Sequence, residues 1–276
     1  MHGGPAPKVW GARSLGRSAV KPMRIYHTSD IHDHRHVAAP INALRAARPG
    51  LYVDCGDSLR GSQTVYHRRE PIVAELDAAH VDVQAMGNRE FHYVFGAVRA
   101  RAALMRHPFV CANLVDTKGR ALPFVADVTV RRDDPSTSSA AADTTSGQAT
   151  PWALRFFGLL VVQYPEGSFF ERVFGWRFLD PIAVAQRMAD TTPPGTTLIA
   201  LSHLGLRHDR LLAERVPRLD LILGGHSHDT LHEPEVVAGV PIVHAGPYGA
   251  FASRTELAKD ATGRAHITDF ALEPLT

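Results

Sequence analysis

Five short segments of this chain carry residue types that bind metal ions, and each of them follows a stretch with the composition of a β-strand. The segments contain Asp30 and His32, Gly56 and Asp57, Gly87 and Asn88, Ser202 and His203, and the run Gly224, Gly225, His226, Ser227 and His228. In α/β sheets, ligands bind in the crevice outside the carboxyl ends of the strands. We therefore expect these side chains to converge on a common site.

The candidate ligands combine carboxylate, amide and imidazole donors and include no thiolate. They are Asp30, His32, Asp57, Asn88, His203, His226 and His228. This set suits two divalent cations of borderline hardness, with Mn²⁺ as the first choice and Fe or Zn²⁺ as alternatives. Two cations roughly 3.5–4 Å apart can hold a phosphoryl group and lower the pKa of a bridging water, so that hydroxide attacks in line. The residues thus predict a two-metal phosphoester hydrolase.

The spacing of the ligands supports this prediction. In a regular strand, residues two apart share a face. Asp30 and His32 have this spacing, and His226 and His228 repeat it. A glycine directly precedes three of the candidate ligands and removes side-chain bulk where they crowd together. Each motif alone has an ordinary explanation, such as a turn or a helix cap, but all five in this order at strand ends are specific for a metal centre.

Apolar periodicity and turn residues indicate the elements that position these ligands. Strands are expected at 23–28, 51–55, 81–86 and 109–112, with helices at 37–47, from Pro71 onward and at 95–105. Antiparallel strands are expected at 122–130 and 152–162. Further on, helices at 181–189 and 208–216 alternate with strands at 197–201 and 219–223, and short strands follow near 236–243, 253–257 and 265–272.

This order of elements predicts an α/β fold, a layered α/β/β/α sandwich of two mixed sheets flanked by helices. Residues 1–22 have no periodicity and are interpreted as a flexible leader, and residues 23–276 as a single domain. Residues 131–150 are rich in Ser, Thr, Ala and Asp and have no apolar anchor. We interpret them as a disordered insertion, because they cannot bury enough surface to offset their ordering entropy.

The composition narrows the class of protein further. The chain is 45% hydrophobic and 21% charged, which is ordinary for a soluble globular protein. Its net charge is +2 and its 30 basic residues are spread along the chain, which argues against a nucleic-acid-binding surface. No stretch approaches the ~20 apolar residues that cross a bilayer, and no secretory signal is evident. We expect a cytoplasmic protein, with Cys55 and Cys111 as buried free thiols.

The order of the motifs resembles that of the calcineurin-like metallophosphoesterases, and among them the catalytic domain of the 5′-nucleotidase group. The resemblance covers about residues 23–272 and includes two further segments, 111–114 (Cys-Ala-Asn-Leu) and 241–249 (Pro-Ile-Val-His-Ala-Gly-Pro-Tyr-Gly). It implies that one metal is held by Asp30, His32, Asp57 and His228, and the other by Asp57, Asn88, His203 and His226. Asp57 would be the bridge between the two metals.

The chain departs from this family at two positions. The family usually has Gly-Asn-His-Glu-Phe-Asp, with the histidine as general acid or transition-state donor and the aspartate orienting it. Here Arg89 and His92 occupy those two places. Arg89 stays protonated and cannot supply a proton to a leaving alkoxide, but its N–H groups can neutralise charge on phosphoryl oxygens. His92 is either a replacement proton donor or a surface histidine.

The expected substrate is a small organic phosphate, such as a nucleotide, a cyclic phosphate or a related monoester or diester. Asn88 and Arg89 are candidate substrate contacts, and His34, beside Arg35 and His36, is either a phosphate contact or part of a solvated loop. A diester with a good leaving group suits the missing acid better than a simple nucleoside monophosphate. The base-clamping domain of the nucleotidases would lie beyond Thr276, so nucleoside specificity is not expected.

The alternative function is a metal-binding regulatory or binding module whose catalysis is reduced or lost because Arg89 replaces the usual histidine. This alternative predicts two bound metals without hydrolysis. A structural protein without metals is a third possibility, and it would require the placement of seven ligands to be accidental. The sequence leaves the physiological substrate, the metal and the oligomeric state open.

Overall fold

The computed structural model describes residues 22–132 and 152–275, and the alternation of side chains along its strands explains how its layers form. In β1 (Met23–Thr28), Ile25 packs into one hydrophobic core and the next residue, Tyr26, into another. Leu198 and Ile199 of a later strand divide between two cores in the same way. Since successive side chains of a strand point to opposite faces, both faces of these strands are buried.

The first sheet has six strands, and the four that come first in the chain are parallel to one another. Across the sheet the order is β14 (Ala265–Pro274), β13 (Phe251–Lys259), β1, β2 (Leu51–Asp54), β3 (Val83–Ala85) and β4 (Phe109–Val110). β13 is antiparallel to both β1 and β14, so the sheet is mixed.

The second sheet is also six-stranded and mixed. Its order is β11 (Glu235–Val237), β12 (Val240–His244), β10 (Leu221–Gly224), β9 (Thr197–His203), β7 (Trp152–Leu160) and β6 (Asp127–Arg132). The four inner strands are parallel, and each edge strand is antiparallel to its neighbour. The ligand segments are therefore the loops that follow the carboxyl ends of the parallel strands in both sheets.

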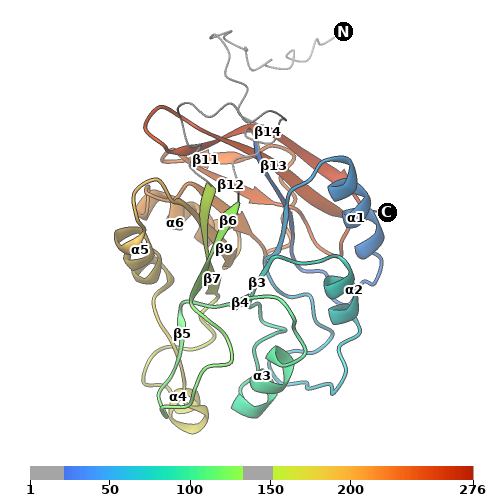
Figure 1. The fold of residues 1–276 in the computed structure, drawn as a ribbon. Helices are drawn as coiled ribbons and strands as arrows, with labels where there is room; N and C mark the ends of the chain where they lie inside the picture. Colours follow the sequence, from blue (N-terminus) through green and yellow to red (C-terminus); the bar gives the residue numbers. More distant parts are fainter. Residues whose placement is uncertain (1–21, 133–151, 276) are drawn as a thin grey trace, which may run out of the picture.

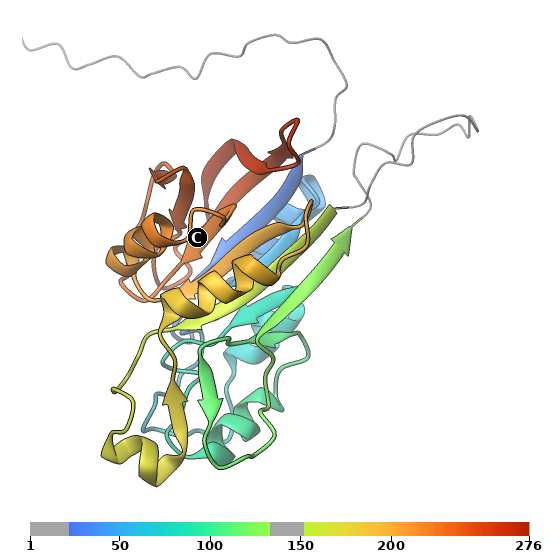
Figure 2. The ribbon, with the colours of Figure 1, turned by 90° about the vertical axis from the view of Figure 1, so that its left-hand side faces the viewer.

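Helices cover both outer faces of the paired sheets. The helices are α1 (Ala38–Ala47), α2 (Ile72–Ala78), α3 (Phe95–Ala102), α4 (Phe169–Phe174), α5 (Pro181–Thr191) and α6 (Leu206–Arg215). α1 and α2 pack on the first sheet, on the right in Figure 1, and α5 and α6 pack on the second, on the left. Figure 2 shows α5 and α6 in front of the strands that they cover. The predicted α/β/β/α sandwich is confirmed.

A small two-stranded sheet was not predicted. β5 (Leu114–Asp116) pairs antiparallel with β8 (Trp176–Phe178), and α4 precedes β8 along the chain. Phe91 and Trp176 are fully buried in the aromatic core beneath these elements. This core joins the Gly87–His92 region to the segment that follows β7.

Some predicted boundaries are wrong, and the reasons are local. The single strand expected near 236–243 is a hairpin of β11 and β12, because Ala238 and Gly239 both have positive φ, at 48° and 82°, and form a two-residue turn. The strand expected at 122–130 begins only at Asp127 and continues to Arg132. The helix expected at 208–216 begins at Leu206, whose N–H is accepted by Ser227 Oγ at 3.0 Å.

The leader and insertion predictions lie almost wholly outside the described residues. Only Pro22 of the leader, and Arg131 and Arg132 of the insertion, are described, and the two arginines pair with β7 as part of β6. The insertion prediction is therefore wrong for these two arginines, and its other residues lie outside the described ranges. The single-domain assignment stays a prediction. Within the described ranges, no helix is both long and apolar enough to cross a membrane. Cys55 and Cys111 are buried free thiols, as predicted.

Candidate metal centre

The structure places all seven candidate ligands at or just beyond strand ends. Asp30 and His32 follow β1, Asp57 follows β2, Asn88 follows β3, His203 ends β9, and His226 and His228 follow β10. The first sheet supplies the first four and the second sheet supplies the rest. The site therefore lies where the carboxyl ends of parallel strands from two packed sheets meet.

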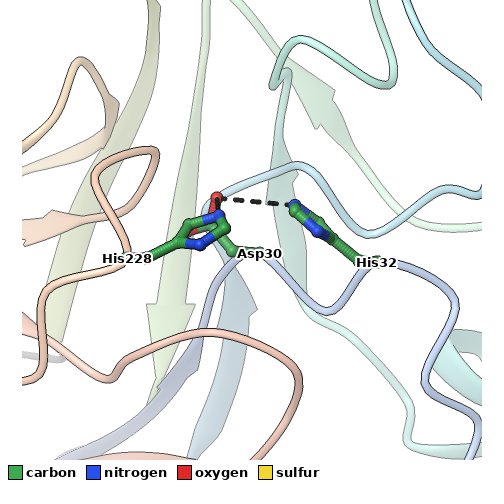
Figure 3. A group of neighbouring side chains, drawn as sticks. All are labelled: Asp30, His32 and His228. Carbon is green, nitrogen blue, oxygen red and sulfur yellow. Dashed lines mark ion pairs between the residues drawn. The ribbon is translucent and has the colours of Figure 1, made fainter.

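One group of side chains consists of Asp30, His32 and His228 (Figure 3). His228 Nε2 lies 3.5 Å from Asp30 Oδ1, and His32 Nε2 lies 4.0 Å from the same oxygen. Two ligands of one cation with bonds of 2.0–2.2 Å are about 3.0–3.5 Å apart. The three donor atoms are therefore spaced for a shared cation after small side-chain adjustments.

A second group contains Asp30, Asp57 and His203. The two oxygens of Asp57 face different histidines, since Oδ1 lies 3.4 Å from His203 Nε2 and Oδ2 lies 3.7 Å from His32 Nε2. Asp57 thus belongs to the second group and also faces His32 of the first. A carboxylate in this position can contribute one oxygen to each of two cations.

Asn88 and His226 lie beside the second group. The His226 ring is 5.1 Å from the His203 ring, and Asn88 Nδ2 is 3.3 Å from His226 Nδ1. Gln163 donates from Nε2 to Asn88 Oδ1 at 2.8 Å. The sequence analysis did not single out Gln163, which follows β7 and restrains the side chain of Asn88.

Three buried atoms of the site have no hydrogen-bond partner among the described residues: Asp30 Oδ1, His32 Nε2 and His203 Nε2. A buried polar atom without a partner typically costs about 1–3 kcal/mol, so native proteins keep few of them. All three atoms belong to the two ligand groups described above. Divalent cations would satisfy all of them, and the donor set therefore fits the metals that the resemblance implies.

The protein fixes the orientation of two ligands from outside the site. His203 Nδ1 lies 2.8 Å from the backbone oxygen of Cys55. Because a carbonyl oxygen only accepts, Nδ1 carries a proton in this contact, and Nε2 faces Asp57. The backbone N–H of Arg89 donates to Asp57 Oδ1 at 2.7 Å. Such outer contacts set the tautomer and direction of metal ligands.

The electrostatics of Asp57 and His203 depend on each other. Burial opposes the charge of both groups, but the contact between them outweighs burial. Asp57 raises the pKa of His203 to about 10, and His203 holds the pKa of Asp57 well below its usual range. His203 therefore carries a proton that a cation at Nε2 must displace. The pKa of His226 is lowered by burial and by the neighbouring His203, which favours its neutral form.

Five of the seven candidate ligands have left-handed backbone conformations. The φ angles are 54° at Asp30, 50° at His32, 57° at Asp57, 77° at His226 and 59° at His228. Positive φ is uncommon in residues other than glycine, and such conformations persist at functional sites where surrounding contacts enforce them. The backbone of the site is thus fixed into conformations that aim the ligands inward.

Two glycines allow the loops after β2 and β3 to touch. A Cβ atom on Gly56 would lie 2.4 Å from the nitrogen of Gly87, and a Cβ on Gly87 would lie 2.3 Å from the nitrogen of Asp57. No side chain fits at either position. The expectation that glycines relieve crowding beside the ligands is confirmed at both.

Glu90 joins these loops, and the sequence analysis missed its role. The fully buried carboxylate accepts four backbone N–H groups, those of Asp57, Ser58, Leu59 and Gly87, at 2.7–3.1 Å. Its place in the Gly87–His92 stretch was the only signal available. Glu90 fixes the backbone of the proposed bridging ligand relative to the loop that carries Asn88.

A second buried acid, Asp54, lies behind the site at the end of β2. It accepts hydrogen bonds from the Gly56 N–H and from the side chains of Thr28, Ser58 and Gln84. Burial, together with the nearby Glu90, raises the pKa of Asp54 to about 7. The folded protein therefore holds a proton on Asp54 that the unfolded chain releases above about pH 4.

This pKa predicts a pH effect on stability. A raised carboxyl pKa contributes stability at low pH that is lost as pH rises from about 4 to about 7. Asp54→Asn keeps a neutral group at every pH, so it does not lose this stability. From pH 5 to pH 8, the free energy of unfolding of the variant is expected to rise by about 2 kcal/mol relative to that of the natural protein. Urea unfolding of both proteins at the two pH values measures this change. Equal pH slopes would contradict it.

The remaining predicted site residues lie at the edges of the ligand groups. Arg89 is half-buried, and its Nη1 donates to the backbone oxygens of Leu59 and Arg60 through long contacts of 3.4 and 3.3 Å. His92 is 8% exposed and accepts the N–H of Val94 at Nδ1, at 3.0 Å. Its ring faces Tyr66. In the described chain, His92 thus contacts the N-cap residue of α3 and the loop that carries Tyr66 rather than the ligands.

His34 lies beside the first ligand group. Its ring is 5.0 Å from that of Tyr248, which in turn is 5.3 Å from the His32 ring. Arg35 is exposed and His36 is half-buried, with Nε2 3.1 Å from the backbone oxygen of Gly249. The structure brings His34 to the mouth of the site but does not test a contact with phosphate.

A two-sheet α/β/β/α sandwich with mixed carboxylate, amide and imidazole donors at its strand ends has the architecture of a metallophosphoesterase. The chain is homologous to proteins of this class, and the resemblance seen in the sequence is confirmed. It is 27% identical over 257 residues to the uncharacterized metallophosphoesterase YunD of Bacillus subtilis, a match that covers 88% of this chain and 51% of YunD. It is 25% identical to a Bos taurus 5′-nucleotidase, covering 94% of this chain and 50% of the relative.

Solved structures agree on the fold. A 5′-nucleotidase precursor from Thermus thermophilus superposes with a TM-score of 0.71 at 22% identity, over 91% of this chain and 54% of that one. The calcineurin-like phosphoesterase YfkN of Bacillus subtilis superposes with a TM-score of 0.67 at 18% identity, over 92% of this chain and 91% of that one. No protein-family model matches the chain. The chain spans about half the length of the curated relatives described above.

Proposed function

We propose that this protein is a two-metal-dependent phosphoester hydrolase that acts on a small organic phosphate. The observation that carries the proposal is the position of Asp57, whose two oxygens face His203 and His32. The facing nitrogens of both histidines have no hydrogen-bond partner in the described chain. The relatives named metallophosphoesterase and 5′-nucleotidase support the same class of reaction.

The ligand assignment is the one that the family resemblance implies, and the two groups of side chains contain five of its seven residues. Asp30, His32, Asp57 and His228 would hold one cation, and Asp57, Asn88, His203 and His226 the other. When bound, the cations supply positive charge to the phosphoryl oxygens and lower the pKa of a bound water. The oxygen and nitrogen donors favour Mn²⁺, with Fe or Zn²⁺ as alternatives.

Arg89 is the residue that we propose acts directly on the phosphoryl group. Its backbone N–H donates to Asp57 Oδ1, so the residue adjoins the proposed bridge. Among the described residues, the guanidinium is held by long contacts to two carbonyl oxygens, so other N–H groups remain for a substrate. A fixed positive charge of this kind stabilises charge that develops on phosphoryl oxygens.

His92 fits a role in proton transfer less well. Burial and the neighbouring Arg101 lower its pKa, and Nδ1 is used by the Val94 N–H. We therefore propose that no side chain protonates the leaving group, and that diesters with good leaving groups are better substrates than alkyl monoesters. A cytoplasmic location and the absence of nucleic-acid binding remain predictions from the sequence.

The direct test is turnover of a chromogenic aryl phosphodiester and its monoester by protein purified and assayed with Mn²⁺. Hydrolysis of both is expected, with the diester faster. Elemental analysis of the same sample should give two metals per chain. Absence of turnover with either substrate, in protein that contains both metals, would contradict the enzymatic function.

Arg89→Ala is expected to lower kcat about a hundredfold, because it removes a fixed donor from the developing charge. His92→Asn retains an acceptor for the Val94 N–H and should change kcat much less. Arg99→Ala, an exposed arginine on α3, is the matched control. Steady-state kinetics with the aryl diester measure all three. A larger loss for His92→Asn than for Arg89→Ala would reverse the two roles.

A second candidate function is a metal-binding regulatory or binding module with reduced or lost catalysis, favoured by the presence of Arg89 where the family usually has histidine. It predicts two bound metals without hydrolysis. It also predicts no gain from Arg89→His unless His92→Asp is made as well. Activity assays of the single and double variants separate this function from the first.

A further inference from the structure

Tyr248 lies at the mouth of the candidate metal centre, on the side of the first ligand group. Its ring is 5.3 Å from the His32 ring and 5.4 Å from the His228 ring, with both histidines in edge contact. The side chain remains 44% exposed. One part of the ring therefore packs on two candidate metal ligands while another part faces solvent beside them.

The backbone holds Tyr248 in an uncommon conformation. Its φ is 64°, which is rare for a bulky residue, and its backbone N–H donates to the backbone oxygen of Asp30 at 2.8 Å. The next residue, Gly249, approaches the loop after β1 so closely that an added Cβ would lie 2.7 Å from Val37 Cγ1. Conformations of this kind cost about 1–3 kcal/mol and recur in ligand clamps. The backbone of Tyr248 is thus held beside the loop after β1.

The His34 ring lies beside the Tyr248 ring. The two rings are 5.0 Å apart and tilted by 44°, and the His36 ring stands nearly perpendicular to His34 at 6.4 Å. His34 Nδ1 donates to the Ile31 backbone oxygen at 2.8 Å, which orients the ring. Two adjacent aromatic rings suit a flat organic group better than a compact anion.

We propose that Tyr248 and His34 form an aromatic subsite for the organic part of the substrate. The group that this subsite fits is planar and aromatic, such as a nucleobase or an aryl ring, joined to a phosphoryl group at the metal centre. The proposal rests on the proposed function, because it takes the phosphoryl position from the candidate metals. It assigns substrate preference to residues that belong to this chain and lie next to its own ligands.

The test measures binding rather than turnover, with non-hydrolysable phosphonates and protein loaded with Mn²⁺. Phenylphosphonate is expected to bind about tenfold more tightly than methylphosphonate, because stacking on an aromatic side chain contributes about this much. Tyr248→Ala should abolish that preference, and Tyr248→Phe should retain it. Tyr248→Gly, which suits positive φ, replaces Tyr248→Ala if the alanine variant does not fold.

Three outcomes would overturn the subsite. They are equal binding of both phosphonates by the natural protein, an equal loss of affinity for both in the alanine variant, and loss of a metal in that variant. The last two would mean that Tyr248 only supports His32 and His228. If the natural protein prefers phenylphosphonate but hydrolyses no aryl phosphoester, the hydrolase function fails and the subsite stands.

Discussion

Asp57→Asn is expected to lower the metal content from two ions per chain to one or none. It is also expected to reduce the rate of hydrolysis more than about a hundredfold, because loss of a direct ligand should cost at least as much as loss of a residue that only orients a ligand. The reason is that both oxygens of Asp57 face histidine nitrogens, at 3.4 and 3.7 Å. Asparagine keeps one oxygen and no charge, so it cannot serve two cations.

The side-chain oxygen of the variant can still accept the Arg89 N–H, so the loop is expected to fold. Asp190→Asn on the exposed face of α5 is the matched control, since it removes one charge far from the ligands. Elemental analysis and the aryl diester assay measure the two effects. A variant that keeps two metals and most of its rate would show that Asp57 is not a bridge.

The fold was predictable from the sequence where apolar periodicity and turn residues agree. β1 was placed to the residue, and the ends of β2, β3, β9 and β10 were placed within a few residues, which sufficed to bring the ligand segments together. α4 was missed although Ser168 caps it by accepting the Glu171 N–H and Gly175 ends it with a φ of 84°. Those cap signals were present in the sequence.

Other features depend on contacts between distant segments, which local patterns do not reveal. β5 exists because Leu114 pairs with Phe178, and neither segment has a strand pattern of its own. Gln163 matters only because its loop lies beside Asn88, and Tyr248 only because its N–H reaches Asp30. Residue type predicted the ligands, whereas the residues that hold them required the tertiary structure.

Glu90→Gln is expected to lower the free energy of unfolding by about 2–5 kcal/mol, because buried donors lose their acceptor. Each carboxylate oxygen of Glu90 accepts two backbone N–H groups: Oε2 accepts those of Asp57 and Gly87, and Oε1 those of Ser58 and Leu59. A glutamine amide replaces one oxygen with a donor. Two backbone donors would then face an NH₂ group in a site without exposure to water.

The same change should weaken metal binding, because Glu90 fixes the Asp57 and Gly87 backbones against each other. Glu214→Gln on the exposed face of α6 is the control for loss of one negative charge. Urea unfolding gives the stability change, and metal titration of the folded variant gives the change in affinity. If metal affinity falls while the free energy of unfolding stays unchanged, the four backbone hydrogen bonds of Glu90 do not stabilise the fold. The effect of Glu90 on metal binding would then come from its negative charge. Loss of both is the result that the four N–H contacts predict.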